Sequence, residues 1–136
     1  MADAQVKLDW TGEGLRFQAD HPSHNTFLID GDGVTSHSPV QALVLSLAGC
    51  TSADVVDIVK KMRLPMSALE VVVEYDRNQE HPRYLTKVHM RFTTRGVAEA
   101  DREKVERAIA LSHEKYCSVA HSLRKDIAFS TELVIG

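Results

Sequence analysis

The chain has 136 residues, of which 43% are hydrophobic and 26% charged, and its formal net charge is -3. These values predict one globular domain over residues 1–136 and exclude a disordered chain or two independent cores. The negative net charge also gives no electrostatic reason to expect binding to nucleic acid or to an anionic membrane.

Short strands are predicted for the N-terminal part of the chain. Apolar side chains alternate at 6–10 and again at 15–19, and a glycine-containing turn at 11–14 separates them. A third strand is expected at 25–30. Residues 31–37 have the composition of a loop.

A long helix is predicted next. Ser38 has the position of an N-cap, Pro39 of the first helical residue, and Gln41 of the residue that closes a capping box. The helix runs to about Met62, and its first half is apolar nearly all round, as expected for a helix buried in the protein or in an interface. The apolar run 39–50 is too short to span a bilayer, and no targeting segment precedes it, so we expect a cytoplasmic protein.

The remaining elements are two strands, two helices and a final strand. Alternating strands at 69–76 and 87–92, joined by a polar stretch, predict an antiparallel hairpin. A helix is predicted at 99–116, a short helical piece from Cys117, and a last strand at 127–135. This order predicts an α+β fold with mainly antiparallel sheets.

The two cysteines are the main candidates for chemistry, because cysteines in a reducing compartment are often catalytic, redox-active or metal-binding. Cys50 lies mid-helix among small or hydroxylic residues, where a helix that only packs would favour alanine or leucine. Cys117 is expected near a helix start, where backbone N–H groups lower a thiol pKa. For each, the alternative is a buried cysteine that packs as a small hydrophobe. They lie too far apart in the chain for a CxxC motif.

A weaker alternative is a zinc site. His113, Cys117 and His121 have the spacing H-x3-C-x3-H, which on one continuous helix would place sulfur and imidazole ligands on a common face. With seven histidines in the chain such spacings arise by chance, and we favour solvent-facing histidines. No metal and no cofactor is therefore expected, and the sequence has no phosphate-binding glycine loop and no HExxH motif.

The cysteine contexts resemble those of a known family. Ser-Pro at 38–39 leads into a helix that carries Leu-Ala-Gly-Cys-Thr-Ser-Ala-Asp-Val-Val at 47–56, and Lys-Tyr-Cys-Ser-Val follows at 115–119. This combination resembles the OsmC/Ohr superfamily of osmotically inducible and organic hydroperoxide resistance proteins, and the pattern is closest to its OsmC-like branch. The resemblance implies an intertwined homodimer built around a long buried central helix.

The resemblance also implies an activity, that of a thiol-dependent peroxidase acting on organic hydroperoxides in oxidative-stress defence. Cys50 would attack the peroxide, and Cys117 would resolve the resulting sulfenic acid as a disulfide. A dithiol reductant, of the lipoyl type in the hydroperoxide-resistance branch, would restore both thiols.

The sequence departs from the best-studied branch at the start of the helix. That branch has a Glu there and an Arg from the N-terminal strands, whereas this chain has Val40 and Gln41 at the helix start. Gln41 is explained by the capping box and Arg16 as a solvated strand residue, but both are kept as supporting site residues. The missing carboxylate leaves an alternative function open, that of a catalytically weak dimeric stress-response or small-ligand-binding protein.

Overall fold

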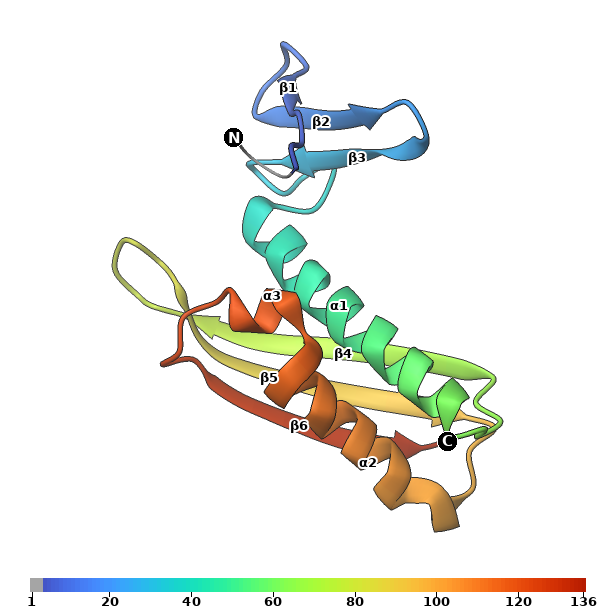
Figure 1. The fold of residues 1–136 in the computed structure, drawn as a ribbon. Helices are drawn as coiled ribbons and strands as arrows, with labels where there is room; N and C mark the ends of the chain where they lie inside the picture. Colours follow the sequence, from blue (N-terminus) through green and yellow to red (C-terminus); the bar gives the residue numbers. More distant parts are fainter. Residues whose placement is uncertain (1–3) are drawn as a thin grey trace. The chain divides into compact units, whose positions relative to one another are not determined.

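The structure, a computed structural model, describes residues 4–136 as an α+β fold with two three-stranded sheets and a long helix (Figure 1). The first three residues of the predicted domain lie outside the described residues. The predicted order of strands and helices is confirmed. The chain groups into two compact units, the first ending at Leu45 and the second comprising Ser46–Gly136.

The first unit contains an antiparallel sheet in the order β1-β2-β3. Its strands are β1 (Asp9–Trp10), β2 (Arg16–His21) and β3 (His24–Asp30). The strand predicted at 6–10 is shortened to β1, and Val6 before it is 99% exposed. Alternation of apolar and polar residues predicts a strand when the apolar face packs against other residues. Val6 is not buried in this unit, so its apolar side chain does not hold a strand there.

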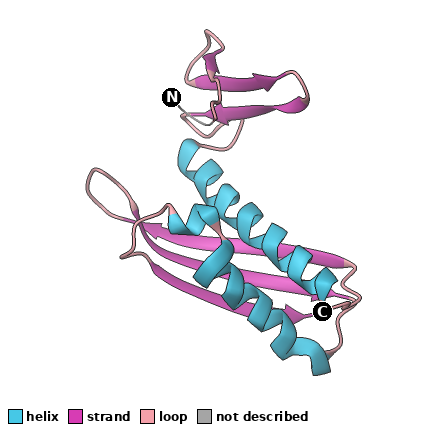
Figure 2. Cartoon of the chain, in the orientation of Figure 1, coloured by secondary structure: helices cyan, strands magenta, loops and turns pink. Residues whose placement is uncertain are grey.

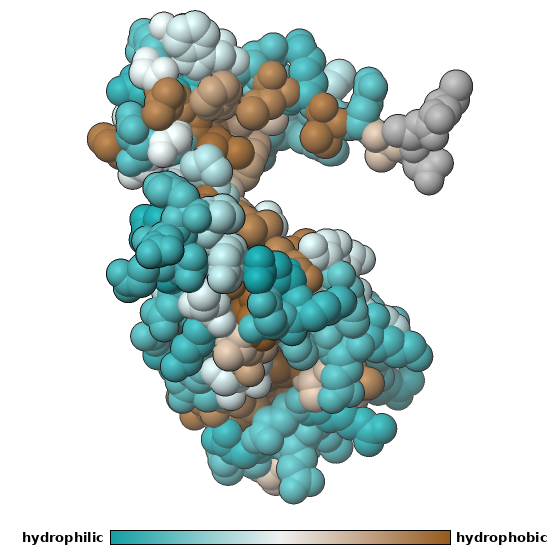
Figure 3. All heavy atoms as spheres, turned by 90° about the vertical axis from the view of Figure 1, so that its left-hand side faces the viewer, coloured by the Kyte–Doolittle hydropathy of each residue, from teal (hydrophilic) through white to brown (hydrophobic). Residues whose placement is uncertain are grey.

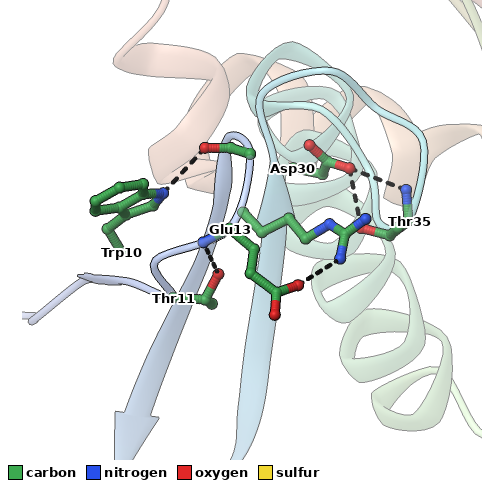
Figure 4. Close-up of polar contacts among 7 residues, drawn as sticks. Trp10, Thr11, Glu13, Asp30 and Thr35 are labelled. Atoms are coloured by element: carbon green, nitrogen blue, oxygen red, sulfur yellow. Dashed lines mark hydrogen bonds and ion pairs between the residues drawn. The ribbon is translucent and has the colours of Figure 1, made fainter.

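The loop after β3 is organised by the Asp30 carboxylate. Asp30 Oδ2 accepts hydrogen bonds from the backbone N–H and the hydroxyl of Thr35, both at 2.9 Å (Figure 4). Its Oδ1 accepts a third from the N–H of Asp32 at 3.0 Å. These donors, the Thr35 N–H first, lower the pKa of Asp30 from 3.8 to about 2. The predicted loop is therefore ordered around one ionised side chain.

Large apolar side chains lie at the surface of the first unit, as the brown atoms in Figure 3 show. A unit of this size has too little interior to bury them all. Such a surface is typical of a region that packs against another molecule or segment. The exposed residues include Leu8, Trp10, Leu15, Phe27, Leu28 and Val34.

Helix α1 (Pro39–Lys61) starts as the sequence predicts. The Ser38 N–H donates to Gln41 Oε1 at 2.9 Å, and the Gln41 N–H donates to Ser38 Oγ at 3.2 Å, which confirms the capping box. The apolar run 39–50 continues past Cys50 into a helix of 23 residues, which is long and apolar enough to cross a membrane by length and composition only. In the fold it is a core helix, and Val55 and Val59 are 0% exposed.

The second unit contains a sheet in the order β4-β5-β6. The predicted hairpin of β4 (Ala68–Arg77) and β5 (Leu85–Arg95) is antiparallel, as expected. Strand β6 (Ala128–Ile135) instead runs parallel to β5, which the sequence did not predict. A parallel neighbour requires a crossover connection, and the helices between β5 and β6 supply it.

The helix predicted at 99–116 is divided into three parts. A 3₁₀ turn (Glu99–Asp101) leads into α2 (Arg102–Leu111). A single π-helical turn (Ser112–Tyr116), called the π turn below, follows α2. Helix α3 (Ser118–His121) comes next. The helices lie across one face of the second sheet (Figures 1 and 2). The core there includes Val55, Val59, Val88, Met90, Phe92, Val105, Ala108 and Ile109.

Candidate functional site

Cys50 lies near the middle of α1, in the second unit, and its side chain is partly exposed. Gly49 beside it does not pack closely, since a side-chain carbon placed on this residue would meet nothing within 4 Å. Gly49 and Ser52 instead line an open groove of about 540 Å³ along α1. Gly49 and Ser52 therefore lie on an open helix face, whereas Thr51 is buried.

Cys117 lies where the π turn ends. Its N–H donates to the carbonyl of Ser112 at 2.8 Å, and its backbone then becomes extended, with φ -72° and ψ 101°. Cys117 is thereby the N-cap of α3, and its Sγ accepts a hydrogen bond from the N–H of Ala120 at 3.3 Å. Its side chain is 0% exposed. Single π turns inside helices are frequent at functional sites, because they reorient the residue that follows.

The fold brings the two free cysteines together across 67 residues of chain. Burial raises the pKa of the Cys117 thiol, and the neighbouring Cys50 side chain raises it further. Hydrogen bonds from Thr51 and from the N–H of Ala120 oppose this effect. The expectation of a lowered Cys117 pKa at the helix start was wrong in its net sign, because burial outweighs the N–H groups.

Three polar residues that the sequence did not single out as site residues complete the surroundings of Cys117. Thr51, the neighbour of Cys50 on α1, donates its hydroxyl to Cys117 Sγ at 3.5 Å and is itself buried. One turn further along, Asp54 Oδ2 accepts a 2.8 Å hydrogen bond from Ser112 Oγ. The only sequence signal for these two hydrogen bonds was the position of Thr51 and Asp54 close to Cys50 on the same predicted helix. Nothing local connected α1 with Ser112.

The two proposed supporting residues lie in the first unit. Gln41 is exposed and takes part in the capping box described above. Arg16, at the start of β2, forms an exposed ion pair with Glu13 at 3.1 Å. These local contacts are enough to explain why Gln41 and Arg16 occur at these positions. A role of either residue in catalysis stays a prediction.

The zinc set considered as a weaker alternative, His113, Cys117 and His121, is not assembled. His113 and His121 lie on opposite sides of the break at Cys117, so the three residues do not share one continuous helix. The His113 ring packs against Phe129 at a centroid distance of 4.8 Å. Among residues 4–136, no group of three His, Cys, Asp or Glu side chains is placed to hold a metal ion.

Comparison with known proteins places this geometry in a family. The family model described as OsmC-like protein matches residues 31–132, which include both cysteines. The chain belongs to the OsmC-like protein family. This OsmC-like protein is 37% identical to Protein YhfA of Escherichia coli K12 over 133 residues, which cover 96% of this chain and 98% of YhfA.

Solved structures share the OsmC-like fold. A hypothetical protein from Aquifex aeolicus VF5 is 23% identical with a TM-score of 0.82, and the match covers 100% of this chain and 99% of that chain. The organic hydroperoxide resistance protein OhrB of Bacillus subtilis is 17% identical with a TM-score of 0.60, and covers 99% of this chain and 100% of its own. At these identities the likeness is one of fold alone.

Proposed function

We propose that this OsmC-like protein is a thiol-dependent peroxidase that reduces organic hydroperoxides through Cys50 and Cys117. The observation that carries the proposal is the proximity of these two free cysteines, which come from α1 and from the N-cap of α3. Of the two sulfurs, that of Cys50 is the accessible one, since Cys117 is fully buried. Accessibility favours Cys50 as the thiol that meets the peroxide.

The chemistry balances over two steps. The Cys50 thiolate attacks one peroxide oxygen, the O–O bond breaks, and the second oxygen leaves with a proton as an alcohol. Cys50 is thereby oxidised to a sulfenic acid. The Cys117 thiol then attacks the Cys50 sulfur, the S–S bond forms, and the sulfenic oxygen leaves as water. An external dithiol, of the lipoyl type by family resemblance, supplies the two electrons that restore both thiols.

The proposal includes a homodimer in a reducing compartment such as the cytoplasm. The apolar side chains exposed on the first unit support an assembly with a second copy, since contiguous exposed apolar surface is unfavourable in water. Light scattering coupled to size exclusion measures the assembly, and a monomer at micromolar concentration would contradict it.

Thiol counting tests the proposed activity. Reduced protein is treated with one equivalent of cumene hydroperoxide, and both thiols are expected to disappear as one disulfide. Cys50→Ser should abolish peroxide consumption. Cys117→Ser is the matched control, because it should still consume one equivalent and leave a sulfenic acid on Cys50 that dimedone traps. Survival of both thiols, or unchanged consumption by Cys50→Ser, would falsify the proposal.

The alternative is a catalytically weak protein that binds a small ligand. It is favoured by the start of α1, where Gln41 provides a cap and no carboxylate. A pocket of about 210 Å³ beside Thr51, lined in part by Met90 and Phe129, is the place for such a ligand in the second unit. Slow, non-saturating peroxide reduction together with tight binding of a small apolar compound would favour this alternative.

A further inference from the structure

The two sulfurs differ in their surroundings in a way that the proposed oxidation step does not use. Cys50 is partly exposed on α1. Cys117 Sγ is fully buried and lies within reach of two donors, the Thr51 hydroxyl at 3.5 Å and the Ala120 N–H at 3.3 Å. Donors that point at a sulfur stabilise negative charge on it. These two donors therefore offset part of the cost that burial places on a thiolate at Cys117.

Reduction of a disulfide depends on which sulfur can be reached and which sulfur can leave. The attacking thiolate needs access, and the departing sulfur leaves faster when its thiolate is stabilised. Here the accessible sulfur belongs to Cys50, and the sulfur with two donors belongs to Cys117. Access therefore sets the direction of cleavage, and the two donors offset part of the penalty that burial places on Cys117 as a leaving group.

Building on the proposed function, we infer that a dithiol reductant attacks the disulfide at Cys50, and that the Thr51 hydroxyl acts as a catalytic group by stabilising Cys117 as the departing thiolate. The reductant is a small dithiol, and its mixed disulfide is carried by Cys50. Thr51 is thus assigned to the reductive half of the cycle.

One thiolate of the dithiol forms a bond to Cys50 Sγ while the Cys50–Cys117 bond breaks, and the electron pair of that bond goes to Cys117 Sγ. The second thiolate of the dithiol then attacks its own sulfur in the mixed disulfide and expels the Cys50 thiolate. The dithiol leaves as a disulfide, oxidised by two electrons, and both protein cysteines are reduced.

The need for a donor follows from the burial of Cys117. Burial raises the pKa of this thiol and so makes it a poorer leaving group. The Thr51 hydroxyl acts against burial, and Thr51 is only 4% exposed, so water cannot readily replace it. Valine has the shape of threonine without the hydroxyl, which makes Thr51→Val the direct test.

The first experiment locates the attacked sulfur in the unmodified protein. The disulfide is made with diamide, excess oxidant is removed, and glutathione is added as a monothiol, which cannot complete the second exchange. After acid quench and trypsin digestion, glutathione is expected on the peptide that contains Cys50. Glutathione on the tryptic peptide 116–124, which contains Cys117, would overturn the inference.

The second experiment measures the reduction rate of the diamide-oxidised protein by dithiothreitol in stopped flow. Loss of a hydrogen bond to a charged group predicts a rate about tenfold lower for Thr51→Val. Thr51→Ser, which keeps the hydroxyl, should stay close to the parent protein. Ser52→Ala is the matched control, because the Ser52 side chain lines the separate groove along α1. Equal slowing by Thr51→Val and Thr51→Ser would overturn the inference.

A third measurement separates charge stabilisation from packing. In a Cys50→Ser background, thiolate absorbance against pH reports the pKa of Cys117 alone. Adding Thr51→Val should raise that pKa by about one pH unit, because a donor to the thiolate is lost. An unchanged Cys117 pKa would overturn the assigned role of Thr51.

Failure of this inference and failure of the proposed peroxidase are distinguishable. Diamide makes the disulfide without peroxide, so the reduction experiments remain decisive when peroxide does not react. If Thr51→Val does not fold, glutathione mapping on the unmodified protein still tests the direction of attack. If neither diamide nor peroxide forms a Cys50–Cys117 disulfide, both the inference and the proposed function are overturned.

Discussion

Replacing Ser112 with alanine tests the hydrogen bond that connects the π turn to α1. Ser112 Oγ donates to Asp54 Oδ2 over 2.8 Å, and the serine is fully buried. Without this donor, the half-buried Asp54 carboxylate loses a partner that water does not readily replace. Since hydrogen bonds to charged groups contribute about 1.5–3 kcal/mol, we expect the free energy of unfolding to fall by about 2 kcal/mol. For 136 residues this lowers the melting temperature by roughly 7 °C.

Urea unfolding of the reduced protein is the assay, at one fixed protein concentration, because assembly makes apparent stability concentration-dependent. Asp54→Ala and the double variant complete a double-mutant cycle with Ser112→Ala, and the coupling energy is expected to be about 1–2 kcal/mol. Asp54→Asn is the matched control. It keeps a neutral acceptor for Ser112, so its loss of stability should be smaller than that of Asp54→Ala.

A coupling energy below about 0.5 kcal/mol would refute the reasoning, because it is within the range expected for independent sites. The same variant has a second readout. The carbonyl of Ser112 accepts the N–H of Cys117 at 2.8 Å, so a loosened π turn displaces the Cys117 sulfur. Ser112→Ala is therefore expected to slow disulfide formation by diamide as well as to lower stability.

At neutral pH, iodoacetamide is expected to label Cys50 before Cys117, because the Cys117 sulfur is buried and burial raises the pKa of its thiol. Mass spectrometry of early time points measures the order of labelling. Equal labelling of the two cysteines would contradict this prediction. The Asp30 carboxyl has a pKa of about 2 in the fold against 3.8 ordinarily. Its ionisation therefore stabilises the fold above about pH 4, and this contribution is lost as the pH falls toward 2. Asp30→Asn should flatten that part of the pH dependence in urea unfolding, and an unchanged slope would count against the loop contacts. Gln41→Ala should lower the free energy of unfolding by about 0.5–1 kcal/mol through loss of the capping box. Gln41→Glu keeps the acceptor and should lower it less, so equal losses would contradict the capping role.

Elements defined by local chemistry were predictable from the sequence. The start of α1 follows from Ser38, Pro39 and Gln41 within a single turn, and the capping box was found as expected. The hairpin of β4 and β5 follows from period-2 alternation on both sides of a polar connection. The contexts of Cys50 and Cys117 identified the family, since both are short sequence patterns. Each of these signals depends on neighbours a few residues apart.

Elements defined by contacts distant in sequence were decided only by the tertiary structure. The parallel pairing of β6 with β5 depends on the path of the connecting helices, which alternation in one strand does not encode. The break at Cys117, inside an otherwise helical sequence, is joined to α1 by the Ser112–Asp54 hydrogen bond. Tertiary packing overrides helix propensity there, and this separates the histidines that one continuous helix would have aligned.

The two cysteines show the same division. Their number, spacing and neighbours, all properties of the sequence, established that they were candidates for redox chemistry and excluded a CxxC motif. The tertiary structure decided that the two cysteines lie near each other, that one is buried and one partly exposed, and that the Thr51 hydroxyl lies beside the buried one. The physical reason is that the pKa and reactivity of a thiol depend on its burial and on nearby donors, and both are set by chain segments brought together in folding.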